Sequence, residues 1–205
     1  MRTRDPVAAG SLMIDPEDGW LAGIRRLASP NCDPRPAGCR PELIVIHGIS
    51  LPPGRYGGPW IDRLFTNSLP PEADPYFATI QDLRVSSHVL VARDGGLTQF
   101  VPFGMRAWHA GASNWCGRAA CNDFSIGIEL EGADDEPYDN RQYVVLAVLI
   151  VTLQRAYPTL AAGAIVGRSD IAPGRKTDPG SAFDWRRLER EVLAAGGRLR
   201  REPPT

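Results

Sequence analysis

The stretch IVGRSDIAPGRKTDPG, residues 165–180, contains residue types that could close a metal site. An apolar strand end and a turn lead into a basic loop that closes on Asp178. A carboxylate oxygen can ligate a metal ion, and a second ligand would be expected directly after Gly167. The residue at that position is Arg168, whose protonated guanidinium has five donors and no lone pair. The sequence therefore raises the question whether such a site can work with an arginine there.

Other polar residues with possible chemistry follow apolar runs elsewhere in the chain. His47 ends the run ELIVIHG, and Glu129 lies in FSIGIELEG, where the polar residues alternate with apolar ones. Each has a plainer interpretation when taken alone. His47 could be a hydrogen-bonded core histidine, Lys176 and Asp178 could form a surface ion pair of little energetic value, and Glu131 is expected to be solvated.

The elements that would position these residues predict an α/β fold. Strands are expected at 42–48, on both sides of the DGG turn at 94–96, at 124–131 and at 161–167. A long apolar helix is expected at 141–157, because Asp139 and Gln142 have capping-box spacing, and a last helix should follow Asp184. We expect a single domain with a central mixed β-sheet flanked by helices, the long helix on one face and the site on the other.

Composition limits the classes of protein that the chain could belong to. It has 205 residues, of which 43% are hydrophobic and 23% charged, and its net charge is −1. These values are typical of a soluble globular domain and indicate neither a nucleic-acid partner nor a membrane partner. The first residues lack the apolar run of a signal peptide, so we expect a cytoplasmic protein. We also expect it to be a monomer. The domain is expected to span 19–197, with terminal tails at 1–18 and 198–205.

Five stretches carry a resemblance to a known family. They are IVIHGISLPPGRYGGPWID, LRVSSHVLVARDGGLTQFVPF, RAWHAGAS, CNDFSIGIELEG and DIAPGRKTDPGSAFDW. In these the chain resembles the AmpD-type zinc amidases, the 1,6-anhydro-N-acetylmuramyl-L-alanine amidases of cell-wall recycling, which have a peptidoglycan-recognition-like fold. The resemblance covers nearly the whole chain, from about Gly19 to Trp185.

The resemblance implies a cofactor, a reaction and a set of site residues. His47 and Asp178 match zinc ligands, Glu129 matches the catalytic carboxylate, and Lys176 matches the residue that stabilises the transition state. Zinc (Zn2+) lowers the pKa of a bound water and polarises a carbonyl, while a carboxylate can move the proton. The bond cut would be the amide between the lactyl group of muramic acid and L-alanine in a muropeptide.

Substrate contacts are implied in the same way. Trp108 and His109 in RAWHAG match a loop of the family's cleft, where the aromatic ring could cover a sugar or a peptide. Trp108 could equally belong to the core. Arg84 matches a position near the diaminopimelate carboxylate, and the planar guanidinium suits a carboxylate, although a lone arginine is often only solvated.

The family has a histidine ligand where this chain has Arg168, and three interpretations stay open. The site could lack zinc, with Arg168 paired to Asp178 as a substitute cation. Alternatively, His88 or His109 could complete a zinc site with His47 and Asp178. In the third interpretation His47, Asp178 and waters hold zinc weakly while the arginine turns to solvent.

A second departure from the family is Gly48, which stands where an asparagine is common and so removes a substrate contact. The sequence thus predicts an amidase whose activity Arg168 could impair. The alternative is an inactive muropeptide-binding relative that lacks zinc, and a plain structural relative is a third, weaker possibility.

Overall fold

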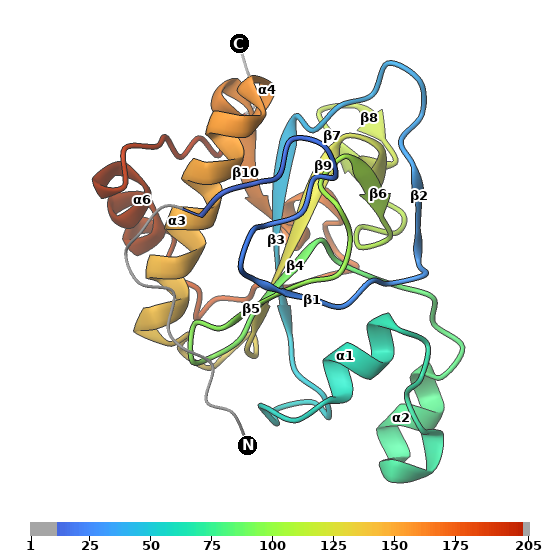
Figure 1. The fold of residues 1–205 in the computed structure, drawn as a ribbon. Helices are drawn as coiled ribbons and strands as arrows, with labels where there is room; N and C mark the ends of the chain where they lie inside the picture. Colours follow the sequence, from blue (N-terminus) through green and yellow to red (C-terminus); the bar gives the residue numbers. More distant parts are fainter. Residues whose placement is uncertain (1–11, 203–205) are drawn as a thin grey trace.

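A six-stranded mixed β-sheet forms the centre of the protein in this computed structural model, which describes residues 12–202 (Figure 1). In spatial order its strands are β1 (Arg25–Arg26), β5 (Leu97–Gln99), β4 (Val89–Val91), β9 (Ser125–Glu131), β3 (Leu43–Ile49) and β10 (Ala164–Gly167). Strands β4, β9, β3 and β10 are mutually parallel, whereas β5 runs antiparallel to β4 across the predicted DGG turn. The predicted α/β class with a central mixed sheet is confirmed.

Helix α3 (Asn140–Ala156) covers one face of the sheet, and α6 (Trp185–Ala194) packs outside it (Figure 1). Along the chain, α4 (Pro158–Ala162) follows directly on α3. Ile126, Ile128 and Leu130 of β9 are fully buried in the core beneath α3, as the alternation in FSIGIELEG predicts. Phe124, expected on the same face, packs instead with Leu43 in a separate cluster, because β9 begins only at the following residue.

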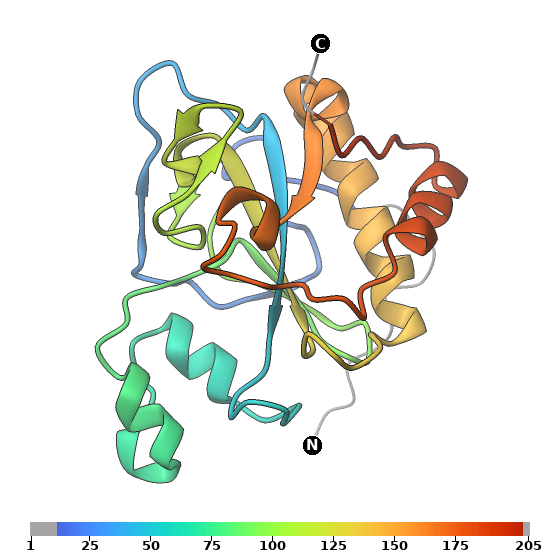
Figure 2. The same ribbon diagram turned by 180° about the vertical axis from the view of Figure 1, so that it is seen from behind.

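Short elements cover the other face. They are α1 (Trp60–Phe65), α2 (Pro75–Ile80), α5 (Arg168–Ile171), the 3-10 turns η1 (Pro71–Ala73) and η2 (Cys121–Asp123), the pair β2 (Cys32–Pro34) and β6 (Met105–Ala107), and the pair β7 (Asn114–Trp115) and β8 (Arg118–Ala119). Figure 2 shows α5 and the segment after it crossing in front of the sheet. The site residues therefore lie on the face opposite α3.

The described ends of the chain contact the domain. Leu12 is part of the core under α3, and Ile14 forms a β-bridge with Leu21. At the other end, the Arg200 carbonyl accepts a 2.7 Å hydrogen bond from the Ile165 N–H. The described parts of the two predicted tails thus pack on the domain, while residues 1–11 and 203–205 lie outside the described residues. Over residues 12–202, no helix has both the length and the apolar character needed to cross a bilayer.

The capping box at the start of α3 predicts a measurable stability loss. The Asp139 carboxylate accepts from the Arg141 N–H, and the Gln142 side chain accepts from the Asp139 N–H. We expect Asp139→Ala to lower the free energy of unfolding by about 1 kcal/mol at neutral pH. Hydrogen bonds from Arg141 lower the pKa of Asp139, so this contribution is present above the ordinary aspartate pKa and is lost as the pH falls below it.

Chemical denaturation of both proteins at neutral and acidic pH measures this difference. Asn140→Ala, which changes the neighbouring exposed residue, is the control and should cost less than Asp139→Ala. An equal cost at both pH values would contradict an ionised cap at Asp139.

Candidate active site

The site lies where the parallel strands β9, β3 and β10 end. In the ladder His47 of β3 stands directly beside Glu129 of β9, and Gly167 of β10 stands beside Ile46. Because carboxyl ends of parallel strands share one edge, Arg168, the next residue after β10, lies close to His47. The Ser169 N–H donates to the Asp178 carbonyl at 3.0 Å, which fixes the loop after α5 against the same edge. The topology thus brings together residues separated by more than a hundred positions.

Three of the predicted site side chains converge around one ring nitrogen. His47 Nδ1 lies 3.3 Å from Asp178 Oδ2 and 3.9 Å from Glu129 Oε1. His47 is fully buried, and Glu129 and Asp178 are 7% and 8% exposed. Arg168 Nη1 lies 3.9 Å from Asp178 Oδ1, too far for a well-formed hydrogen bond. The expected second-ligand position is therefore occupied by a cation beside two carboxylates.

The orphaned atoms of this cluster test whether a metal ion fits. His47 Nδ1, Glu129 Oε2 and Asp178 Oδ2 are buried and have no hydrogen-bond partner in the structure. Buried polar atoms are normally paired, so this concentration indicates a place for a cation. Of the three positions expected to hold zinc ligands, only those of His47 and Asp178 carry a ligand atom, because Arg168 has no lone pair. Over residues 12–202, no set of three His, Cys, Asp or Glu side chains is arranged to hold a metal. The residues present do not complete a three-ligand zinc site.

Charges around the cluster shift its acid-base properties. Burial raises the pKa of Glu129 above that of an ordinary glutamate. Burial alone would raise the pKa of Asp178 too, but the adjacent His47 and Arg168 together lower it. Repulsion from Arg168 lowers the pKa of Lys176. The site thus holds one carboxyl group with an increased proton affinity beside one that stays ionised.

The remaining histidines lie beneath the site. His109 Nδ1 is 2.9 Å from His47 Nε2, the ring nitrogen that points away from Asp178. His88 Nδ1 accepts from the Gly127 N–H at 3.0 Å, and its Nε2 lies 3.2 Å from the Met105 carbonyl. Burial lowers the pKa of His88 to about 3 and that of His109 well below its ordinary value, so both rings are neutral. Neither ring is placed beside Asp178 as a third ligand.

A cleft of about 910 Å³ opens in front of the cluster. The part of its lining formed by Glu129, Arg168 and Lys176 is its head, and an apolar wall comes from α1, α2 and the segment after them. Representative residues of that wall are Leu64, Phe65, Tyr76, Ile80, Leu83 and Val85. Such a cleft suits a ligand that has both an apolar part and a polar reacting end.

The predicted substrate contacts are placed less directly. The Arg84 guanidinium donates to the carbonyls of Gln81 and Leu83 at 3.0 and 3.2 Å, although Leu83 itself lines the cleft. Trp108 is half-buried, and its indole N–H donates to Asp33 at 3.2 Å. Neither Arg84 nor Trp108 is among the described residues that line the cleft. His109 does line it, but both of its ring nitrogens have partners within the protein.

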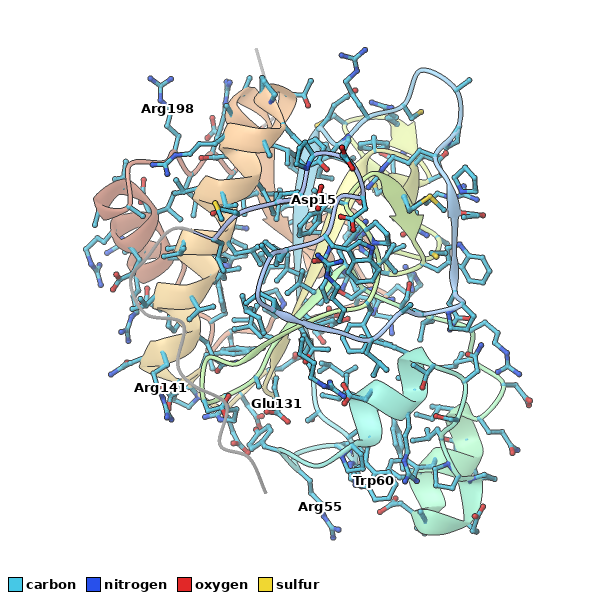
Figure 3. All side chains as sticks on the ribbon, viewed as in Figure 1. Asp15, Arg55, Trp60, Glu131, Arg141 and Arg198 are labelled. Atoms are coloured by element: carbon cyan, nitrogen blue, oxygen red, sulfur yellow. The ribbon has the colours of Figure 1, made fainter. Side chains whose placement is uncertain are left out.

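Glu131 is a further buried carboxylate that the sequence did not reveal. It was expected to be solvated, and this was wrong, since it is only 6% exposed. Its oxygens accept from the N–H groups of Gly57 and Arg93, at 2.5 and 3.2 Å. Figure 3 shows Glu131 at the end of its strand, whereas Arg55 of the neighbouring loop extends away from the domain. Glu131 thus fixes the loop over residues 50–59. No local pattern in the sequence predicts this contact, because its partners lie far away along the chain.

Gly48 has a packing reason in this chain. A Cβ there would collide with the hydroxyl of Tyr138, which donates to the Pro179 carbonyl at 2.9 Å, next to Asp178. We expect Gly48→Ala to lower the free energy of unfolding by about 1–3 kcal/mol, as in other overpacked sites. Urea denaturation measures this loss.

Removing the hydroxyl tests the cause. In a double-mutant cycle, Gly48→Ala should cost less in a Tyr138→Phe background than alone. Strict additivity would show that the Tyr138 hydroxyl is not what excludes a side chain at position 48.

Comparison with known proteins gives consistent matches. A family model described as N-acetylmuramoyl-L-alanine amidase matches residues 37–181. The 1,6-anhydro-N-acetylmuramyl-L-alanine amidase AmpD of Escherichia coli is 57% identical over 172 residues, which are 84% of this chain and 93% of that protein. A crystal structure of a selenomethionine AmpD derivative, 54% identical, superposes with a TM-score of 0.85 over 88% of this chain and 99% of the other.

A structure with a bound ligand is also similar. AMPDH3 from Pseudomonas aeruginosa in complex with anhydromuramic pentapeptide matches with 28% identity and a TM-score of 0.54. The match covers 80% of this chain and 62% of that one.

Proposed function

Because the chain belongs to the N-acetylmuramoyl-L-alanine amidase family, we propose that it hydrolyses the amide between 1,6-anhydro-N-acetylmuramic acid and L-alanine in muropeptides during cell-wall recycling. The observation that carries the proposal is the cluster of His47, Glu129 and Asp178 at the head of a 910 Å³ cleft. The volume of that cleft suits a sugar joined to a peptide stem, and AMPDH3 binds a ligand of that kind.

In this proposal Glu129 and Lys176, at the head of the cleft, have different roles in the reaction. Glu129 takes a proton from the attacking water and passes it to the leaving amine, a task that its raised pKa favours. Lys176 at the same end stabilises the oxyanion that forms on the carbonyl. Arg84 is proposed to contact a carboxylate of the peptide stem, because its neighbours Leu83 and Val85 line the cleft.

The proposal includes zinc only as a weakly held ion. When bound, zinc would supply an activated water, and His47 and Asp178 would be its protein ligands. Arg168 contributes no ligand atom and adds a positive charge beside Asp178, so affinity and rate are expected to be lower than with a third ligand. The protein is further proposed to act as a cytoplasmic monomer, with its amidase domain at 19–197.

Incubation with an anhydro-muropeptide tests the function. With added zinc, the amidase should release the free peptide, which mass spectrometry detects. Binding of the muropeptide without release would support the inactive relative, and absence of both would leave only a structural resemblance. Glu129→Gln, which keeps the shape of the site, is the control for adventitious cleavage.

A further inference from the structure

Arg168 is a cation whose hydrogen-bond donors are largely unused. Its Nε is buried and has no hydrogen-bond partner, and its Nη1 lies 3.9 Å from Asp178 Oδ1, beyond hydrogen-bonding distance. Over residues 12–202, no hydrogen bond holds this guanidinium. An arginine stays protonated and has five donors, which proteins normally pair when the side chain is largely buried. The side chain is 20% exposed and lines the cleft, so a ligand in the cleft can reach it.

Lys176 brings a second positive charge to the same place. Its N–H donates to the Ala172 carbonyl at 3.1 Å, and the Ala172 N–H donates to the Arg168 carbonyl at 3.0 Å. The loop therefore turns back on itself, and both cationic side chains line the head of the cleft. Asp178, the acid beside Arg168, is not among the described residues that line the cleft. The lining thus contains the two cations but not the carboxylate that accompanies one of them.

The attraction for an anion is local to this end of the cleft. Carboxylates also line the cleft, from Glu129 at the head and from the segment 134–136, so the cleft as a whole is not positive. Arg175, the third cation of the described lining, is already engaged, because its guanidinium donates to the carbonyls of Ala110 and Ala112. An anionic ligand would therefore be held by direct contact with Arg168. The paired N–H groups of a planar guanidinium match the two oxygens of a carboxylate.

The proposed reaction produces such a group at this end of the cleft. Hydrolysis breaks the bond between the lactyl carbonyl carbon and the alanine nitrogen, adds the hydroxyl of water to that carbon and adds a proton to that nitrogen. The sugar is released as a carboxylic acid, which is ionised at neutral pH. Before cleavage the same group is a neutral amide, so only the product presents a negative charge to Arg168 and Lys176.

We propose that Arg168 and Lys176 form a carboxylate site that binds the sugar acid, 1,6-anhydro-N-acetylmuramic acid, without a metal ion. The identity of this ligand rests on the proposed function, whereas the site itself follows from the unpaired guanidinium at the head of the cleft. The side chains of residues 12–202 do not complete a zinc site, and the arginine that interrupts it supplies donors for an anion instead. The protein is expected to retain this product and to be inhibited by it.

Isothermal titration calorimetry of the full chain, with a chelator present, tests the site. The two probes are 1,6-anhydro-N-acetylmuramic acid and its methyl ester, in which the carboxylate is replaced by a neutral group. The acid should bind about 10- to 100-fold more tightly than the ester, the range for a hydrogen bond to a charged group. Arg168→Leu should remove most of this difference. Arg175→Leu is the matched control and should keep most of it, because it removes a cation of the same loop whose donors are already used.

The comparison of acid and ester in the unaltered chain decides the proposal even if a variant fails to fold. Equal affinities, including no binding of either probe, would overturn it. Binding of the acid that requires added zinc, or equal losses in the two variants, would overturn it as well. Tight binding of the acid by a chain that cleaves no muropeptide would refute the proposed function alone. Cleavage without a preference for the acid would refute the carboxylate site alone.

Discussion

Replacing Arg168 by histidine is expected to raise the affinity for zinc by at least about 100-fold. Loss of a group that only orients a metal ligand already lowers metal affinity by up to about 100-fold, and the gain of a ligand should have at least that effect. The new imidazole would stand beside β3, next to His47 and Asp178, and would supply the third ligand atom. The substitution also removes a positive charge that lies 3.9 Å from Asp178. Amidase activity should rise with zinc occupancy, because water activation depends on the metal.

Elemental analysis and thermal unfolding with and without zinc measure the change. The variant should hold one zinc per chain and gain stability as zinc is added, by linkage of binding to folding. Arg168→Leu is the control that removes the charge without adding a ligand, and it should gain far less. If the unaltered chain already holds one zinc and cleaves muropeptide as fast as the histidine variant, Arg168 does not occupy a ligand position.

Local sequence signals predicted the elements that carry the site. The alternation in FSIGIELEG placed Ile126 and Ile128 under the long helix and left Glu129 on the opposite face. The spacing of Asp139 and Gln142 predicted the start of α3, where both capping contacts are formed. Such patterns are reliable because hydrophobic periodicity and capping act within a few residues of the chain.

Contacts between distant segments could not be predicted in this way. The strand β2 is not among the strands expected from the sequence, because its pairing partner is β6, more than seventy residues away. The solvated role expected for Glu131 was wrong for the same reason, since the Gly57 N–H that pairs with it belongs to another loop. Likewise, the contacts of the His109 ring nitrogens with His47 and Ser125 were not predicted, because the register of the sheet sets them. The role of His109 as a substrate contact stays a prediction.

Glu129→Gln is expected to lower kcat about 10²- to 10⁴-fold, the range for losing a general base, with little change in KM. It is best measured in the Arg168→His background, where activity should be highest. The free energy of unfolding of this variant, in contrast, should stay the same or rise. Burial raises the pKa of Glu129, so its ionised form destabilises the folded state above the ordinary glutamate pKa, and a neutral amide of the same shape removes that cost at neutral pH.

Glu131→Gln is the matched control, because Glu131 is a buried glutamate on the same face of the same strand. Its carboxylate accepts two backbone N–H groups, so neutralising it should reduce stability by about 1–2 kcal/mol while the chemical step is largely kept. Steady-state kinetics and denaturation of both variants should therefore give crossed results: Glu129→Gln loses turnover and keeps or gains stability, and Glu131→Gln loses stability and keeps turnover. If Glu129→Gln lost stability and retained kcat, the carboxylate would be a structural group, and proton transfer would have to be assigned to another residue of the cleft.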